Sequence, residues 1–118
     1  MALKLIDIGE MHGVRNGFAT NSLLDDFSAH DAGARLWPQT ERLKAAAIAA
    51  RLTGEAKYFS MTVAAADRLQ RYLDCPIPGL WYDRIDAQGD LVDEPAPASS
   101  FYHLVAAIAE ISALARLA

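Results

Sequence analysis

The sequence predicts an all-α fold in which helical hairpins are joined by long loops, and three observations indicate this class. Two adjacent runs, 38–53 and 55–73, carry apolar residues at helical spacing. Almost nothing separates these runs, so the two helices must turn back on each other as an antiparallel hairpin. One pattern also occurs twice, with an offset of 62 residues: a glycine opens a long loop, and an Ala- and Leu-rich run follows it.

The first helix is expected over residues 2–12. Its apolar residues lie on more than one face, which indicates a helix that needs neighbours on several sides. They are Leu3, Leu5, Ile6, Ile8 and Met11. Gly13 is placed to end this helix in the left-handed conformation that glycine adopts readily.

The next helices are predicted from the residues at their ends. Pro38 suits a first helical turn, where its missing N–H would have no partner anyway, and Gly54 suits the end of the same helix. The third helix then covers 55–73 with the same apolar spacing. A fourth helix is expected from a cap at Ser99 to about Leu117, because a serine hydroxyl can accept a free backbone N–H of the first turn.

The two loops begin at Gly17 and Gly79 and are too long to be simple connections. The second loop is expected to form a short β-hairpin over residues 79–92, with Gly89 turning the chain. The stretch 18–27 of the first loop carries a fainter version of the same pattern. We therefore expect small β-hairpins to decorate an otherwise helical protein.

Composition limits the number of domains and the kinds of partner. With 118 residues, 53% of them hydrophobic, the chain can bury one core but hardly two. A net charge of −4 argues against nucleic acid, which requires a basic face. No apolar stretch approaches the length needed to span a membrane, and Lys4 and Asp7 interrupt the N-terminal apolar run, unlike a signal peptide. The lone Cys75 fits a reducing compartment, so a cytoplasmic location is expected.

The internal repeat bears on whether the domain is complete. Repeated α-hairpins bury their apolar faces by stacking on further copies of themselves. Two copies are too few to close such a structure. Residues 1–118 are therefore expected to form a single incomplete domain.

Three segments carry a resemblance to a known family. They are 35–45 (RLWPQTERLKA), 79–83 (GLWYD) and 95–103 (PAPASSFYH). In this order they resemble the C-terminal portion of the N-acylglucosamine 2-epimerase superfamily, with its mannose-6-phosphate isomerase-like branch nearest. The resemblance implies an (α/α)₆ barrel of six helical hairpins, of which this chain supplies the C-terminal third. It also implies a monosaccharide or sugar phosphate as substrate, bound where the long loops meet the N-termini of the inner helices.

The same resemblance implies that His103 is a catalytic general acid and base. Epimerising a sugar at carbon 2, or interconverting an aldose and a ketose, removes a proton next to a carbonyl and returns it. Imidazole suits both steps because its ordinary pKa lies near neutrality. At a helix N-terminus the dipole disfavours imidazolium by roughly 0.3 to 1 kcal/mol, so the ring can accept a proton. The chemistry needs no cofactor, and His12, His30 and His103 lack the spacing of metal ligands.

Four further residues are candidates for the same cleft. Trp37 offers an aromatic face, and Glu41 offers a charge-assisted hydrogen bond to a sugar hydroxyl or to an imidazole. They are four residues apart, so one helix face presents both. Gln39 is a weaker candidate because its spacing points it elsewhere, and Tyr102 either lines the cleft or merely belongs to the helix start. The alternative is purely structural: Glu41 as a first-turn acid and Trp37 as a packing residue.

The chain also departs from the family pattern. The arginine that the family places early in the barrel and its first catalytic histidine, in a Pro-Gly-His-type motif, have no counterpart here. The isolated chain is therefore expected to be inactive, as a truncated product, as part of a longer protein, or as a piece that assembles with copies of itself. Two other functions stay open: a non-catalytic saccharide-binding remnant that uses Trp37, Trp81 and Glu41, and a helical self-association module. The sequence does not decide between epimerase and aldose-ketose isomerase.

Overall fold

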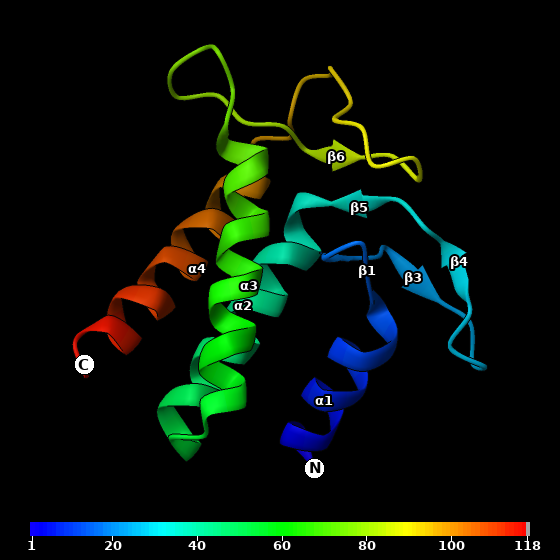
Figure 1. Ribbon diagram of the computed structural model, residues 1–118. Helices are drawn as coiled ribbons and strands as arrows, with labels where there is room; N and C mark the ends of the chain where they lie inside the picture. Colours follow the sequence, from blue (N-terminus) through cyan, green and yellow to red (C-terminus); the bar gives the residue numbers. More distant parts are fainter. Residues whose placement is uncertain (118) are drawn as a thin grey trace.

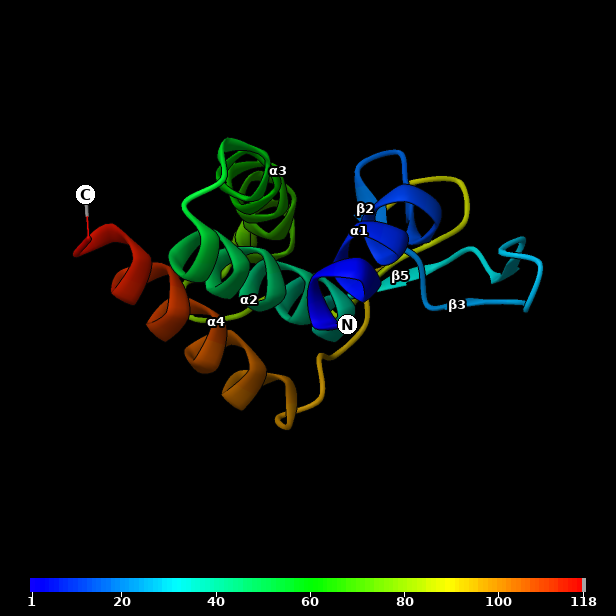
Figure 2. The ribbon, with the colours of Figure 1, turned by 90° about the horizontal axis from the view of Figure 1, so that it is seen from below.

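The computed structural model describes residues 1–117, and most of them are helical. The four helices are α1 (Ala2–Gly13), α2 (Leu36–Thr53), α3 (Ala56–Leu73) and α4 (Ser100–Ala115). In Figures 1 and 2, α2 lies between α3 and α4 and packs against both, whereas α1 and α4 lie on opposite sides of the α2–α3 pair. The predicted helical class is thus confirmed. Within the described part of the chain, no helix has both the length and the apolarity of a membrane span.

The hairpin of α2 and α3 forms where the sequence predicts it. Gly54 adopts the left-handed conformation, with φ of 71°, and its N–H donates to the carbonyl oxygen of Ala50 at 2.9 Å. Pro38 lies in the first turn, as expected, but α2 begins two residues earlier, at Leu36. This earlier start moves Glu41 from the first turn of α2 into the second.

The predicted ending of α1 is wrong. Gly13 is the last residue of the helix, and Val14 follows it in an extended conformation with φ of −101°. A left-handed turn at Gly13 would redirect the chain, and instead the chain continues straight into a strand. No residue of α1 is buried, although the sequence suggested neighbours on several sides: Leu5 is 62% exposed and Met11 is 74% exposed.

The predicted position of the α4 cap is correct, since Ser99 is the N-cap residue, but the hydrogen bond expected of its hydroxyl does not form. Ser99 has the helical φ and ψ of −60° and −24°, unlike the extended residue that normally caps a helix, and its side chain makes no capping bond. The helix starts at the next residue, Ser100, whose buried hydroxyl donates to the carbonyl oxygen of Pro97 at 2.6 Å and accepts the indole N–H of Trp81 at 2.7 Å. The helix ends at Ala115, two residues before the predicted end at about Leu117.

The first loop contains two hairpins where the sequence predicted one. β1 (Val14–Arg15) pairs with β2 (Phe18–Ala19), and β3 (Ser22–Leu23) pairs with β4 (Ala29–Asp31). The first turn is Asn16-Gly17, with φ of 52° and 85°, the conformation that favours Asn-Gly in two-residue hairpins. The expected hairpin over 18–27 is wrong because this turn precedes that stretch.

The second loop forms the expected hairpin and also joins the first loop. Gly89 turns the chain with φ of 90°, and Ile85 bridges to Leu91 on the return. β6 (Arg84–Ile85) additionally pairs with β5 (Ala34–Arg35), immediately before α2. No sequence pattern predicted this pairing, which holds the second loop beside the N-terminus of α2 (Figure 1).

The core lies between α2, α3 and α4 and continues under the paired loops. α2 presents small residues where its neighbours approach, since Ala46, Ala47, Ala49 and Ala50 are each at most 2% exposed. Tyr72 of α3 is fully buried, and its hydroxyl donates to the carbonyl oxygen of Ala34 at 2.9 Å. The close packing of α4 on α2 fixes how the first turns of these helices face each other.

Candidate active site

Two titratable side chains from different helices meet at the centre of the candidate site. Glu41 lies in the second turn of α2, and His103 lies in the first turn of α4. The Nδ1 atom of His103 is 3.0 Å from Oε1 of Glu41, a hydrogen-bond distance. The internal repeat placed these two residues at equivalent positions, and the structure brings them into contact.

A third residue, Lys44, completes this cluster. Its Nζ atom lies 2.7 Å from the same Oε1 of Glu41. Partial burial raises the pKa of the Glu41 carboxyl, but the hydrogen bonds from Lys44 and from His103 lower it, and the net pKa falls below its usual value. Glu41 is therefore an ionised acceptor at neutral pH.

The charge on Glu41 decides how His103 carries its proton. An ionised carboxylate can only accept hydrogen bonds, so Nδ1 of His103 is the donor in this contact. When the ring is neutral, Nε2 is then left without a proton and can accept one. Glu41 can therefore hold His103 in the tautomer that acts as a general base, and it can stabilise the imidazolium that forms after proton transfer.

Aromatic residues flank the imidazole. The ring centroid of Trp37 is 6.2 Å from that of His103, and Trp37 is 45% exposed. The ring of Tyr102 lies closer, at 4.0 Å between centroids, and is 62% exposed. Four of the five residues that the sequence singled out therefore lie close together: Trp37, Glu41, Tyr102 and His103.

Gln39 lies apart from that locality and is 1% exposed. Its side-chain oxygen accepts the N–H of Ala19 at 2.8 Å, and its amide group donates to the carbonyl oxygens of Ala19 and Arg35 at 2.8 and 2.9 Å. These bonds attach the first loop to α2. The geometry favours a structural role for Gln39 over the expected contact with substrate.

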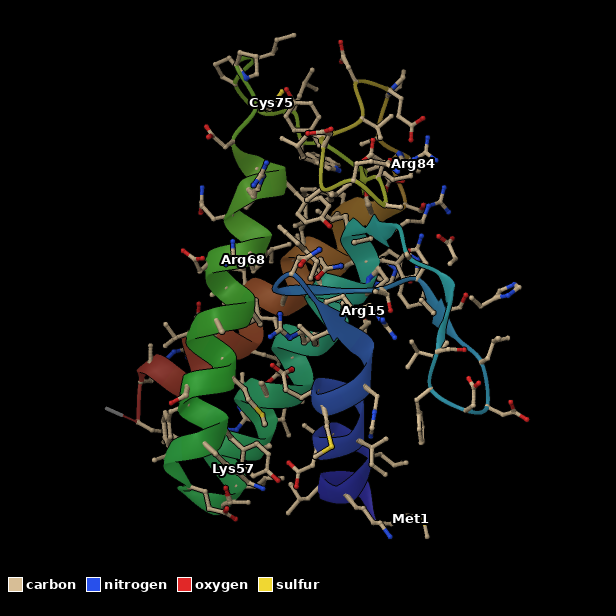
Figure 3. All side chains as sticks on the ribbon, turned by 45° about the vertical axis from the view of Figure 1, so that its right-hand side comes forward. Met1, Arg15, Lys57, Arg68, Cys75 and Arg84 are labelled. Carbon is tan, nitrogen blue, oxygen red and sulfur yellow. The ribbon has the colours of Figure 1, made fainter. Side chains whose placement is uncertain are left out.

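Trp37 also lines a cavity of about 410 Å³ on the loop side of the molecule, together with Asn21, Asp31, Arg35 and Arg84. Figure 3 shows Arg84 among the loops and Lys57 at the opposite end. Both arginines of the cavity already have acidic partners: Arg35 lies 3.6 Å from Asp83, and Arg84 contacts Glu94 at 3.1 Å. The cavity is polar, and its cations are largely neutralised.

The lysine of the cluster and this polar cavity were both missed by the sequence reasoning. Lys44 stands three residues after Glu41, a spacing at which a Glu–Lys pair can form on one helix face, so the signal was present. Asn21 immediately precedes β3 and Asp31 ends β4, and Nδ2 of Asn21 is 3.0 Å from Oδ2 of Asp31. No local pattern joins them to Trp37.

Trp81 is not part of the cluster. It packs against the core, and its indole N–H is donated to Ser100. Among residues 1–117, no group of three or more His, Cys, Asp or Glu side chains is arranged to hold a metal ion.

Comparison with known proteins gives the family. Residues 1–107 match the family model of N-acylglucosamine 2-epimerase (GlcNAc 2-epimerase). The chain is 48% identical over 115 residues to a mannose-6-phosphate isomerase of Rhizobium meliloti (strain 1021); the match covers 93% of this chain and 30% of that protein.

A solved structure supports the fold. The crystal structure of a D-mannose isomerase superposes with a TM-score of 0.78 at 17% identity, covering 91% of this chain and 29% of that one. The chain thus spans less than a third of the length of these two proteins. On the family match, the chain belongs to the N-acylglucosamine 2-epimerase family.

Proposed function

We propose that this chain is the C-terminal segment of a sugar isomerase or epimerase, and that His103 transfers the proton at carbon 2 of the substrate. The observation that carries the proposal is the 3.0 Å contact between Nδ1 of His103 and Oε1 of Glu41. A neutral imidazole held in this tautomer presents Nε2 as a base near an exposed aromatic surface.

The reaction proceeds by removal and return of one proton. Nε2 of His103 takes the proton from the carbon next to the carbonyl, and the electron pair of the broken C–H bond forms an enediolate. Return of the proton to the neighbouring carbon, with a hydroxyl proton moving between the two oxygens, interconverts an aldose and a ketose. Delivery of a proton to the opposite face of the same carbon gives an epimer, and it needs a second acid that this proposal assigns to the remaining hairpins. Glu41 remains ionised throughout, and it stabilises the imidazolium of His103 by accepting the hydrogen bond from Nδ1–H.

The aromatic residues provide the sugar-binding surface in this proposal. The exposed face of Trp37 can pack against the C–H face of a pyranose ring. Tyr102, whose ring contacts that of His103, lines the approach to the imidazole and limits its movement. We include these two residues as substrate-binding residues, and we leave Gln39 out because backbone groups occupy its amide.

The names of the two relatives point to a mannose-type substrate, as the free sugar or its phosphate. In this proposal the chain forms the last third of an (α/α)₆ barrel, and the remaining hairpins supply the rest of the site. The isolated chain is then inactive, because nothing faces His103 across the substrate.

A chimera tests the proposal directly. The chain is joined to the part of the Rhizobium meliloti relative that it does not match, and deuterium incorporation at carbon 2 of mannose and mannose 6-phosphate is followed by NMR. His103→Ala should reduce the exchange by at least about 10²-fold, the usual contribution of general acid-base catalysis.

The control is His30→Ala, at an exposed residue of β4, which should leave the exchange unchanged. Undiminished exchange in His103→Ala would remove this residue from the mechanism. An unmodified chimera that folds but exchanges neither sugar would contradict the substrate class.

A second candidate is self-association through α4. Phe101, Val105 and Ile108 recur along this helix and are 58%, 49% and 55% exposed. An apolar stripe of this kind marks a surface that binds another protein segment. It is compatible with the first proposal, since the missing hairpins of a barrel would need such a face.

A further inference from the structure

We propose that Lys44 is a positioning residue for the proton transfer, because its ammonium group holds the Glu41 carboxylate where it can accept the Nδ1–H of His103. The inference rests on the proposed function and concerns the same site. It assigns a role to a residue that forms no contact with the substrate in that proposal and acts only through Glu41.

The geometry shows two donors that converge on one oxygen. Nζ of Lys44 lies 2.7 Å from Oε1 of Glu41, and Nδ1 of His103 lies 3.0 Å from the same atom. Lys44 approaches from the next turn of α2, and His103 approaches from α4. A carboxylate on a flexible, 42% exposed side chain has many orientations, and two donors from different directions restrict them.

The surrounding charges explain why Lys44 pairs with Glu41 and with no other acid. A hollow of about 560 Å³ between α2 and α4 contains two carboxylates, Glu41 and Glu110. Arg51, one and a half to two turns beyond Lys44 on α2, pairs with Glu110 at 3.3 Å. Each acid of the hollow therefore has its own cation.

The remaining cation near Glu41, Arg42, also has an acidic partner of its own. Arg42, next to Glu41 in the sequence, is directed at Glu10 of α1, with its Nε atom 2.8 Å from Oε2. The Lys44 side chain itself is only 22% exposed, unlike a lysine that extends into solvent. Lys44 is thus the cation that forms the ion pair with Glu41 beside His103.

Removing this cation should change both members of the pair. Burial raises the pKa of Glu41, and the hydrogen bond from Lys44 is the largest of the interactions that lower it. Without Lys44, the pKa of Glu41 should rise, and the carboxylate should be free to rotate away from His103. A less firmly held acceptor lets the neutral ring revert toward the Nε2–H tautomer, which cannot act as a base at Nε2.

The experiment is nitrogen-15 NMR of the chain labelled at its histidine rings, at a pH where the rings are neutral. His103 is assigned by the loss of its signals in His103→Gln. In the unmodified chain the Nδ1–H form of His103 should dominate. In Lys44→Met the tautomer ratio should shift toward Nε2–H by up to about fivefold, the effect of a partly exposed ion pair, and Lys44→Arg should restore most of it.

The matched control is Arg51→Met, which removes a cation from the same helix and the same hollow but from the other acid. It should leave the His103 tautomer ratio and the Glu41 titration unchanged, and circular dichroism should show equal helix content in all variants. The inference is overturned if Lys44→Met changes neither the tautomer ratio nor the pKa of Glu41, or if His103 is mainly Nε2–H in the unmodified chain. Because this measurement needs no turnover, the two failures are distinguishable: a chimera that exchanges neither sugar contradicts the proposed function, whereas an unchanged tautomer ratio and an unchanged Glu41 pKa in Lys44→Met contradict the hold of Lys44 on the Glu41–His103 pair.

Discussion

At the scale of single residues, the arrangement depends on how one carboxylate oxygen is shared. Oε1 of Glu41 accepts from an ammonium group on its own helix and from an imidazole on the neighbouring helix. The first donor belongs to a local i, i+3 pair, which any helix can form. The second donor, His103, reaches Glu41 only if α2 and α4 pack with these two residues side by side. The packing of the two helices therefore determines which ring nitrogen of His103 carries the proton.

The lowered pKa of Glu41 predicts a pH dependence of stability. A carboxyl group whose folded-state pKa lies below its unfolded value stabilises the fold above the unfolded pKa, and this contribution is lost as pH falls through the folded pKa. The Gln side chain of Glu41→Gln cannot titrate, so the free energy of unfolding of this variant should depend less on pH in the acidic range below the ordinary glutamate pKa of 4.5. Urea unfolding of both chains from neutral to acidic pH measures this difference.

Other carboxylates titrate in the same window, since the pKa values of Asp7, Asp26 and Asp31 are also lowered by hydrogen bonds. Asp26→Asn removes one of these carboxylates from an exposed hairpin tip and should also reduce the pH dependence, so it gives the size of the effect at an exposed site for comparison. Parallel curves for the unmodified chain and Glu41→Gln would mean that Glu41 gains nothing from its partners in the folded state.

At the scale of elements, Gly54 ends α2, whereas Gly9 lies inside a helix. Gly54 carries the chain from α2 to α3 with φ of 71°, and a Cβ atom there would meet nothing within 4 Å. The cost of a side chain at this position is therefore one of backbone conformation alone. By contrast, Gly9 lies inside α1, where glycine only lowers helix stability, and a Cβ atom there would also meet open space.

These two glycines give a prediction of opposite signs. Gly54→Ala should destabilise the fold by about 1 to 2 kcal/mol, the cost of a left-handed conformation for a residue with a Cβ atom. Gly9→Ala should stabilise it by up to about 1 kcal/mol through helix propensity. Urea unfolding at neutral pH measures both changes. A stabilised Gly54→Ala variant would show that the turn between α2 and α3 differs from the one described.

The pairing of the two loops acts at the same scale. β5 and β6 place the second loop beside the start of α2, and the backbone N–H of Leu36 donates to the carbonyl oxygen of Asp83 at 2.7 Å. Trp37 follows directly in the sequence. The short sheet thus helps to set the position of the aromatic residue that borders both His103 and the polar cavity.

At the scale of the whole molecule, the described chain leaves apolar helix faces uncovered on both flanks. α1 has no buried residue, and the stripe of α4 formed by Phe101, Val105 and Ile108 is about half exposed. Apolar surface of this extent is unusual for a stable monomer. It fits a chain that covers less than a third of the length of its relatives.

The exposed stripe predicts that the isolated chain self-associates. Replacing Val105 and Ile108 with Lys should weaken the association by at least about tenfold, since burying one such side chain contributes about 1.5 to 3 kcal/mol. Sedimentation velocity over a range of concentrations measures the change. The control is Ile77→Lys, at a residue that is 58% exposed and lies between α3 and the second loop. A folded, monomeric unmodified chain at micromolar concentration would contradict this prediction.

Much of the helical framework could be predicted because its signals are local. Apolar spacing, Pro38 and Gly54 act within one helix or at its ends, and they correctly placed the hairpin of α2 and α3. The contact of Glu41 with His103 was also predictable, although it joins residues far apart in the chain. The two residues are 62 positions apart, the offset of the internal repeat, and each lies near the start of its helix, so the packing of α4 on α2 brings them together.

Only the tertiary structure decided the choices among competing partners. The sequence predicted Ser99 as the cap of α4, but it did not show that the neighbouring Ser100 hydroxyl accepts the indole N–H of Trp81. Gln39 could face a cleft or a loop, and Lys44 could face Glu41 or Glu110. These outcomes depend on the distance and register between elements that no local pattern contains. By itself the sequence determined which segments become helices and which residues are chemically able to act, and the packing of α2 on α4 decided which of them meet.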